Sequence, residues 1–320
     1  MTLRSPVISV VIPLFNKEKE VHRALRSVLT QTFQDIEVIV INDGSVDHGA
    51  AVVSSFADPR IKLINQENQG VAAARNRGIA EATADLIGFL DADDKWAPDY
   101  LETINRLVNK YPAASVYATG YVFTRDNGKD RIALVRGLPE DFTEGILENY
   151  FLVASQSDPP LSSSTVTLRK YAIESIGGFP LGITSGEDLL TWARLAVRFR
   201  IAYLKEPKAR LWHPLNADER PGRIPAVPDF VGDGLKNMLS DIDPLRSADL
   251  KKYIALWYTM RAVIYIQLAD GRAARNELAM SSGMTGMSIK KLLLYCFTFL
   301  PGRLGRTLYD FRQQMKVRKN

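Results

Sequence analysis

Three acids, Asp91, Asp93 and Asp94, stand within four positions of the stretch FLDADDKW, residues 89–96, directly after an apolar run. Like charges this close repel one another unless a positive charge lies among them. Carboxylate oxygens suit Mg²⁺ or Mn²⁺, which usually takes further ligands from phosphate oxygens. The pattern favours a divalent-metal site. The alternative is a set of solvated acids near the positive N-terminus of a helix that starts near Pro98.

The acids occupy the fourth of four similar places along the chain, each at the end of an expected buried strand. We predict strands at 7–13, 36–41, 61–64 and 86–90 from their runs of β-branched and apolar residues. In open parallel sheets, ligands bind outside the carboxyl ends of the strands. Four strand-end segments should therefore meet at one crevice: Pro13–Asn16, Asn42–Ser45, Asn65–Asn68 and Asp91–Asp94.

Helical periodicity separates these strands and predicts an α/β fold. Apolar residues recur at helical spacing from Val21 to Leu29, around Val52 and Val53, and over 70–83. Alternation of this kind indicates a mainly parallel sheet with helices on both faces. Further along we expect helices from Pro98 and at 187–199, a helical turn at 171–176, and strands at 115–123, 164–170 and 201–204.

The C-terminal part of the chain has a different pattern. Residues 131–165 give no clear prediction, and 214–228 hold four prolines and predict a loop or lid. From about Val231 onward the pattern is helical, with helices expected at 235–239, 250–269 and 273–280. We therefore expect a catalytic domain over residues 1–230 and a helical C-terminal extension with a basic tail over 231–320.

Composition and charge narrow the function classes. The chain has 320 residues, 46% of them hydrophobic, and one cysteine, Cys296, which excludes an intrachain disulfide and favours a reducing cytoplasm. We find no secretory signal and no apolar run long enough to span a bilayer. From Ser288 to Asn320, eight Lys and Arg residues stand against one acid, so the net charge of +5 comes from the tail. No nucleic-acid-binding module accompanies it, so we expect no nucleic-acid partner.

The tail joins the apolar stretch Leu292–Leu300 to basic residues. Such a segment could make a peripheral contact with an anionic membrane at its inner face. The alternative is a helix packed on the protein with a disordered basic end.

Five segments in register resemble family 2 glycosyltransferases of the GT-A (Rossmann-like) fold. They are SVVIPLFNKEKEVHRALRSVLTQTF, EVIVINDGSVD, NQGVAAARNRGI, IGFLDADDKWAPDYL, and GGFP followed by SGEDLLTWARLA. The resemblance covers roughly residues 7–215. It implies inverting, metal-dependent transfer of a sugar from a nucleotide-diphosphate sugar, with UDP or dTDP as the leaving group. The implied acceptor is a glycan or a lipid-linked sugar, in cell-surface polysaccharide synthesis.

The resemblance also assigns the nucleotide-binding residues. Pro13 and Phe15 would line the base pocket, and Asp43 would accept a hydrogen bond from the base. Arg75 would position the nucleotide or brace the acids, and Asp91 would lie near the ribose. Each has a structural alternative: Phe15 could belong to the core, Asp43 could stabilise its turn, and Arg75 could be a surface helix residue.

The same resemblance places Asp93 on a Mg²⁺ or Mn²⁺ ion that bridges the diphosphate, with His213 beside it, and leaves the role of Asp94 open. Asp188 would be the catalytic base. The chemistry independently requires a carboxylate across the sugar from the metal, to take the acceptor's proton. Asp188 and its neighbour Glu187 could instead be acids that stabilise a helix N-terminus, and His213 could be structural.

Three rival functions remain at this point. A sugar nucleotidyltransferase normally has a glycine-rich loop after its first strand, where this chain has PLFNKEKE. A HAD-type phosphatase carries its acids after the first strand rather than the fourth. A nucleotide-sugar-binding protein without turnover is the third rival, and the presence of both Asp93 and Asp188 argues against it.

Overall fold

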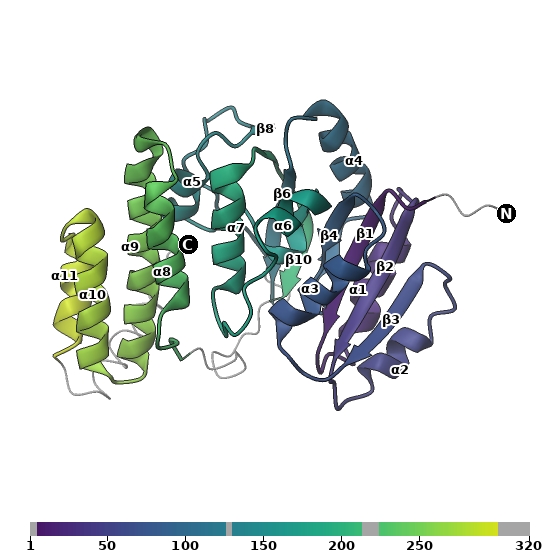
Figure 1. Ribbon diagram of the computed structural model, residues 1–320, viewed down its shortest axis with the longest axis horizontal. Helices are drawn as coiled ribbons and strands as arrows, with labels where there is room; N and C mark the ends of the chain where they lie inside the picture. Colours follow the sequence, from purple (N-terminus) through teal and green to yellow (C-terminus); the bar gives the residue numbers. More distant parts are fainter. Residues whose placement is uncertain (1–4, 126–129, 213–223, 300–320) are drawn as a thin grey trace. The chain divides into compact units, whose positions relative to one another are not determined.

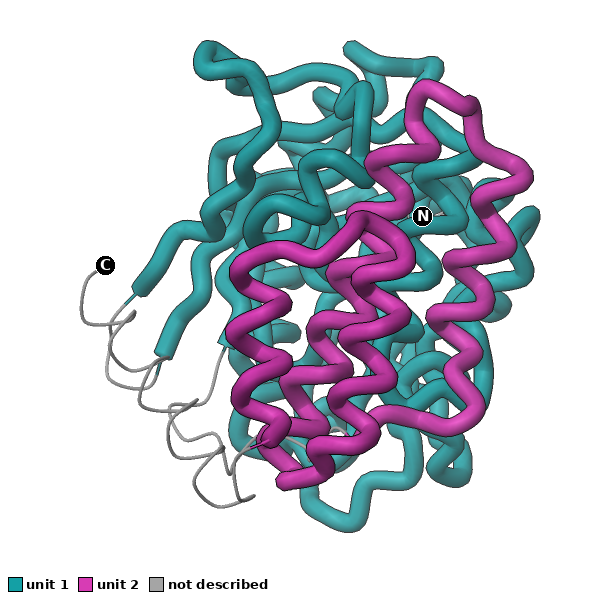
Figure 2. Tube along the Cα trace, turned by 90° about the vertical axis from the view of Figure 1, so that its left-hand side faces the viewer, with its two compact units in different colours: residues 1–220 teal, residues 221–320 magenta. Residues whose placement is uncertain are grey.

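The chain is described here by a computed structural model that covers residues 5–125, 130–212 and 224–299. It has two compact units, residues 1–220 and residues 221–320 (Figure 2). The expected division into a catalytic domain over 1–230 and an extension over 231–320 stays a prediction, because compactness alone does not tell where the catalytic part ends.

The first half of unit 1 is a parallel sheet, as predicted. Its strands are β1 (Ile8–Leu14), β2 (Ile36–Asp43), β3 (Ile61–Gln66) and β4 (Leu86–Phe89), paired in parallel in the order β3-β2-β1-β4 (Figure 1). Three of the four are almost completely buried, since their runs of Val and Ile face apolar layers on both sides. Their carboxyl ends therefore lie at one edge, where the predicted site residues begin.

The second half makes the sheet mixed. Its strands are β5 (Lys95–Trp96), β6 (Val116–Thr124), β7 (Arg131–Ile132), β8 (Glu144–Ile146), β9 (Val166–Arg169) and β10 (Ile201–Trp212). Antiparallel β9 lies between β4 and β6, and β10 pairs in parallel with β6 and antiparallel with β5. Together the described strands form one ten-stranded sheet, which confirms the predicted α/β class.

Helices cover both faces of the sheet, as predicted. The helices of unit 1 are α1 (Val21–Leu29), α2 (Gly49–Ser54), α3 (Val71–Glu81), α4 (Tyr100–Lys110), α5 (Tyr150–Gln156), α6 (Lys170–Ser175) and α7 (Glu187–Arg198), with a 3₁₀ turn at Ser163–Thr165. Helices α1, α2 and α4 share one core with Ile8, Val10 and Ile12. Helix α3 packs on the other face, where a Cβ on Gly78 would come within 2.2 Å of Val11.

Strand β10 differs most from its prediction. The sequence pattern predicts a strand over 201–204, but β10 continues to Trp212. Its register against β6 shifts between Leu204 and Ala209, where charged residues and Pro207 interrupt the apolar pattern. Gly120 of β6 accommodates this irregularity, because a Cβ there would lie 2.2 Å from the Lys205 carbonyl oxygen. The continuation matters for function, since it brings Trp212 to the segment Asp91–Asp94, which we call the acid loop.

Unit 2 is helical, as predicted for the C-terminal extension. It contains α8 (Phe230–Asn237), a 3₁₀ turn (Met238–Ser240), α9 (Pro244–Gln267), α10 (Gly271–Thr285) and α11 (Ile289–Phe297). Helix α9 begins earlier than its apolar pattern suggests, because Asp243 caps the Leu245 amide and Pro244 suits a first helical position. Leu294 of α11 is buried against α9 and α10. Among the described helices, none combines the length and apolarity needed to cross a bilayer.

Candidate active site

The three acids after β4 have different surroundings. Asp94 points into the protein: its Oδ1 accepts a hydrogen bond from the Trp212 amide at 2.8 Å, and its Oδ2 accepts one from Ser164 Oγ at 2.5 Å. Burial, together with the charges of Asp91 and Asp93, raises the pKa of the Asp94 carboxyl well above its ordinary value. Asp94 therefore ties the acid loop to β10 and to the segment before β9.

Asp91 and Asp93 remain partly accessible, with side chains 34% and 30% exposed. Asp93 forms an ion pair with Lys17 Nζ at 2.7 Å, and its backbone carbonyl accepts a hydrogen bond from Arg23. Burial lowers the pKa of Lys17, but the hydrogen bond and charge of Asp93 outweigh it and leave that pKa raised. Asp91 accepts from Arg75 Nη2 at 2.8 Å. Both acids thus keep oxygen atoms at an accessible edge of the sheet.

Arg75 joins two segments that lie far apart in the sequence. Its guanidinium is buried, contacts Asp91 on one side, and lies 3.4 Å from Glu187 Oε1 on the other. Burial opposes the charged form of Arg75, but the two carboxylates outweigh it and raise the pKa. The alternative that Arg75 is an ordinary surface residue is wrong. Of its two implied roles, the one that the contacts support is bracing the acids.

Glu187 and Asp188 begin α7, directly after Gly186, which has a left-handed φ of 89°. Burial first, and then the charge of Asp188, raise the pKa of the Glu187 carboxyl, while Arg75 opposes the rise. Asp188 Oδ1 accepts from the Leu189 amide at 2.7 Å, and the Asp188 charge also contributes to the raised pKa of Arg75. Asp188 therefore lies near the Arg75 guanidinium, but it forms no ion pair with a side chain of the described residues.

The residues expected around the base lie at the ends of β1 and β2. Phe15 is 47% exposed, so it does not belong to the core, and Pro13 is half-buried. Asp43 is buried: its Oδ2 accepts from the Gly70 amide at 2.8 Å, and its Oδ1 accepts from the Gln69 amide and from Gln66 Nε2. Asp43 thus caps the segment that leads into α3, and any bond to a base would use the remaining capacity of Oδ2.

Some residues of the site were not visible in the sequence pattern. Lys17 follows the predicted strand-end segment by one position and could have been noticed as a cation beside the acids. Ser164 and the Trp212 amide reach Asp94 through contacts between distant segments, which no local pattern encodes. His213 lies outside the described residues. Trp212, the residue before it, donates its amide to Asp94.

The two accessible carboxylates fit a divalent cation. Mg²⁺ and Mn²⁺ accept hard oxygen ligands and are often held by one or two carboxylates, with substrate phosphates and water completing the shell. Asp91 and Asp93 supply such oxygens from one turn, which the hydrogen bond from the Asp94 amide to the Asp91 carbonyl closes. Across residues 5–125, 130–212 and 224–299, no group of three or more His, Cys, Asp or Glu residues could hold a metal ion by itself.

Sequence comparison then identifies the family. Residues 9–172, just over half of the chain, match the profile described as Glycosyl transferase family 2. The chain belongs to this family. It is 37% identical over 123 residues to the glycosyltransferase GlyA of Streptococcus pneumoniae, which covers 38% of this chain and 18% of GlyA. It is 29% identical over 307 residues to an uncharacterized glycosyltransferase of Rickettsia conorii, which covers 92% of this chain and 47% of that protein. The chain thus spans less than half the length of these two relatives.

Solved structures confirm the fold. Residues 1–349 of TarS of S. aureus, in complex with UDP-GlcNAc, superpose with a TM-score of 0.68 at 18% identity, covering 93% of this chain and 88% of that one. The mannosyltransferase PcManGT of Pyrobaculum calidifontis, in complex with GDP-Man and Mn²⁺, gives a TM-score of 0.59 at 19% identity, covering 95% and 84%. The expected GT-A architecture with a helical C-terminal region is therefore confirmed.

Proposed function

We propose that this chain transfers a sugar, with inversion, from a nucleotide-diphosphate sugar to a glycan or lipid-linked acceptor in cell-surface polysaccharide synthesis. The observation that carries the proposal is the double contact of Arg75, with Asp91 on one side and Glu187 on the other. It holds an acid loop suited to a metal–diphosphate close to a second pair of acids from α7. Inverting transfer requires both groups in one site.

A divalent cation, Mg²⁺ or Mn²⁺, would be held by Asp93 with Asp91 nearby. When bound, it would stabilise the negative charge of the departing diphosphate as a Lewis acid. The complex of PcManGT with GDP-Man and Mn²⁺ supports this choice of ion. Lys17, which pairs with Asp93, adds a second positive charge at the same side. For the donor we favour UDP or dTDP, and the TarS complex with UDP-GlcNAc supports UDP.

In the transfer step, the acceptor oxygen forms a bond to the anomeric carbon while the bond from that carbon to the diphosphate oxygen breaks. The acceptor's proton passes to a carboxylate. Asp188 suits this role, since it is half-buried beside Arg75 without an ion pair to any described side chain. Glu187 suits it less, because Arg75 engages its carboxylate. We infer that Glu187 positions Arg75 and that Asp188 accepts the proton.

Two rival functions lose support from family membership and fold. Neither a sugar nucleotidyltransferase nor a HAD-type phosphatase belongs to the family that residues 9–172 match. A binding protein without turnover remains a distinct outcome of the test below.

A panel of nucleotide sugars tests the proposal. The full chain is incubated with each donor, an acceptor mixture and Mn²⁺, and both nucleoside diphosphate and glycosylated product are measured. We expect one or a few donors to be consumed with matching product, and EDTA to stop the reaction. Donor binding without consumption of any donor would favour the non-catalytic rival, and turnover unaffected by EDTA would refute the metal.

We also propose that the basic tail helps the protein contact an anionic membrane. Residues 300–320 lie outside the described residues, whereas the preceding helix α11 exposes Ile289, Leu292 and Leu293. Because Leu294 packs into unit 2, a truncation after Phe299 removes the tail without disturbing α11. Vesicle flotation should show weaker binding of this truncation to anionic vesicles, and a full-length variant with the six tail cations changed to Gln should behave alike. Equal flotation of all three proteins would refute the contact.

A further inference from the structure

A cavity of about 650 Å³ lies in unit 1 among α1, β5 and the end of β10, and none of the residues assigned to the nucleotide lines it. We call it the basic pocket. Its lining contains no acid, and it contains six residues that carry or can carry positive charge: His22, Arg23, Arg26, Lys95, Lys208 and Arg210. Apolar side chains, among them Trp96, Pro98 and Val122, complete the lining.

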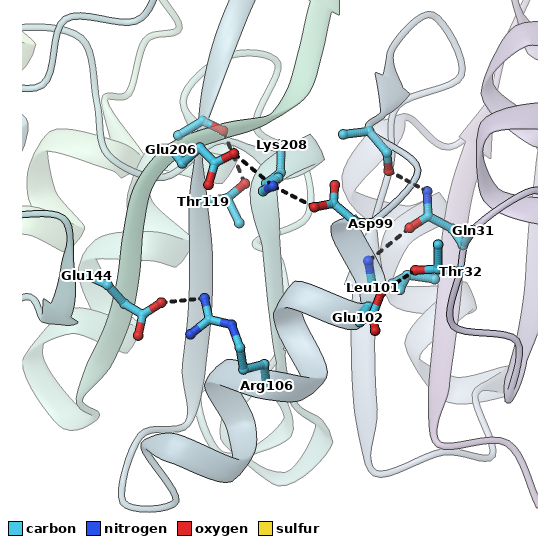
Figure 3. Close-up of polar contacts among 12 residues, drawn as sticks. Gln31, Thr32, Asp99, Leu101, Glu102, Arg106, Thr119, Glu144, Glu206 and Lys208 are labelled. Carbon is cyan, nitrogen blue, oxygen red and sulfur yellow. Dashed lines mark hydrogen bonds and ion pairs between the residues drawn. The ribbon is translucent and has the colours of Figure 1, made fainter.

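The walls of the basic pocket are held in place by buried hydrogen bonds. Gln31, just after α1, accepts from the Leu101 amide at 2.9 Å (Figure 3). Its Nε2 donates to the Ser27 and Ala97 carbonyls. On the other side, β5 pairs with β10 at Trp96. The pocket is therefore bounded by elements that are fixed to one another rather than by a loose surface loop.

Two of the cations are already paired with partly exposed acids. Lys208 Nζ lies 2.6 Å from Asp99 and 2.9 Å from Glu206, as Figure 3 shows. Arg210 forms an ion pair with Asp130. These pairs shape the pocket but leave little positive charge for a ligand.

Within residues 5–125, 130–212 and 224–299, the remaining cations form no ion pair with a carboxylate. Arg23 donates to the Asp93 carbonyl and lies 3.5 Å over the ring of Trp212, and its buried Nε has no hydrogen-bond partner within the described part of the chain. Arg26 forms no ion pair with any acid of the residues that the structure describes. Lys95 forms none there either, although its charge contributes, after Arg210, to the lowered pKa of Asp130. Cations gathered in a cleft without acids concentrate a positive potential that attracts anions.

We propose that the basic pocket is an anion site that takes a phosphate or pyrophosphate group. An Arg guanidinium matches phosphate oxygens with its planar fork, and a Lys adds a point charge. The volume exceeds that of a single ion and part of the lining is apolar, so the group would belong to a larger molecule. Its source is either a soluble phosphate-bearing molecule or a phospholipid headgroup. The site is distinct from the nucleotide site and does not depend on sugar transfer.

Calorimetric titration of inorganic pyrophosphate into the full chain tests the proposal, with EDTA present so that no metal assists the acid loop. The pocket variant Arg26→Gln/Lys95→Gln is compared with Arg136→Gln/Arg200→Gln, which removes two exposed cations elsewhere on unit 1. We expect the pocket variant to lose about tenfold or more in affinity, as for the loss of one or more charge-assisted contacts, and the control to lose less than about twofold. If the double variant does not fold, Arg26→Gln alone replaces it, since this side chain is exposed.

Three outcomes would overturn the proposal: no binding to the wild type, equal losses in the two double variants, or binding abolished by Lys17→Gln, which removes the cation paired with Asp93 and would place pyrophosphate at the acid loop. Flotation with phosphatidic acid vesicles and with phosphatidylcholine vesicles then distinguishes the sources. Binding to phosphatidic acid that falls in the pocket variant but not in the control indicates a lipid headgroup. Pyrophosphate binding without such flotation indicates a soluble ligand.

Discussion

The acid loop and the basic pocket meet at one residue and have opposite character. The Asp93 carboxylate faces Lys17, whereas the Asp93 carbonyl accepts a hydrogen bond from Arg23 of the basic pocket. On the first side the accessible charge is negative and suits a metal ion with a diphosphate. On the second side it is positive and suits a phosphate without a metal. A single short loop thus separates two regions that should select ligands by different chemistry.

Burial explains which charges are left for ligands in each region. In the acid loop, Asp94 is buried and used to hold β10, so only Asp91 and Asp93 remain accessible. In the basic pocket, Lys208 and Arg210 are used by acids at its rim. In both regions, the charged side chains available to a ligand are those that the protein does not fully bury or pair. These are Asp91 and Asp93 in the acid loop, and Arg26 and Lys95 in the basic pocket.

The largest expected effect on transfer concerns the acids at the start of α7, which lie across Arg75 from the acid loop. Asp188→Asn should lower the single-turnover rate of transfer by about 10²–10⁴, or about 3–5 kcal/mol of barrier, because asparagine keeps the size but cannot accept the proton. UDP affinity should stay unchanged. Glu187→Gln is the matched variant and should cost less, since Arg75 engages the Glu187 carboxylate. A larger loss in Glu187→Gln than in Asp188→Asn would move the base to Glu187.

Arg75 should matter for stability as well as for the site. Arg75→Gln leaves Asp91 and Glu187 without the buried cation between them, which should lower the free energy of unfolding by about 3 kcal/mol. Arg77→Gln is the control, because Arg77 is exposed and pairs only with Glu81 within the described residues; it should cost about 0.5 kcal/mol or less. Urea unfolding of both variants checks this, and equal losses would contradict the bridging role of Arg75.

A smaller effect is expected away from both regions. Glu144 accepts hydrogen bonds from Arg106 (Figure 3) and from Lys110. These bonds outweigh burial and lower the pKa of Glu144 from 4.5 to about 2. A lowered pKa contributes stability that is fully present above pH 4.5 and is lost as the pH falls toward 2. Because both cations are half exposed, Glu144→Gln should cost only about 1 kcal/mol at neutral pH. The measurement is urea unfolding of wild type and variant from pH 7 down to pH 2, and the difference in their free energies of unfolding should vanish at the low end. The control is Glu140→Gln, at an exposed acid, for which this difference should be near zero at every pH.

The sequence predicted the acid region much better than the basic pocket. The strands that end at the site are runs of Val and Ile buried on both faces, which are easy to identify, and the acids follow them directly. The pocket depends on β10 beyond its irregular register, on β5, and on the contact of Asp94 with Trp212. These are pairings between distant segments, and the charged residues and Pro207 in β10 hide its continuation. The same reason explains why β7 and β8 were not predicted, since each has three residues or fewer and pairs with a distant strand. Helix α5 was missed because its seven residues are too few to show a helical period.

The proposed function requires that the acid loop binds a nucleoside diphosphate through a metal, and UDP binding measures this directly. UDP is titrated into the full chain by calorimetry, once with Mn²⁺ and once with EDTA, for the wild type and for Asp93→Asn. We expect Mn²⁺ to raise the UDP affinity of the wild type by at least about tenfold, about 1.4 kcal/mol, and Asp93→Asn to remove this gain. An equal UDP affinity with Mn²⁺ and with EDTA, or a full Mn²⁺ effect in Asp93→Asn, would contradict this expectation.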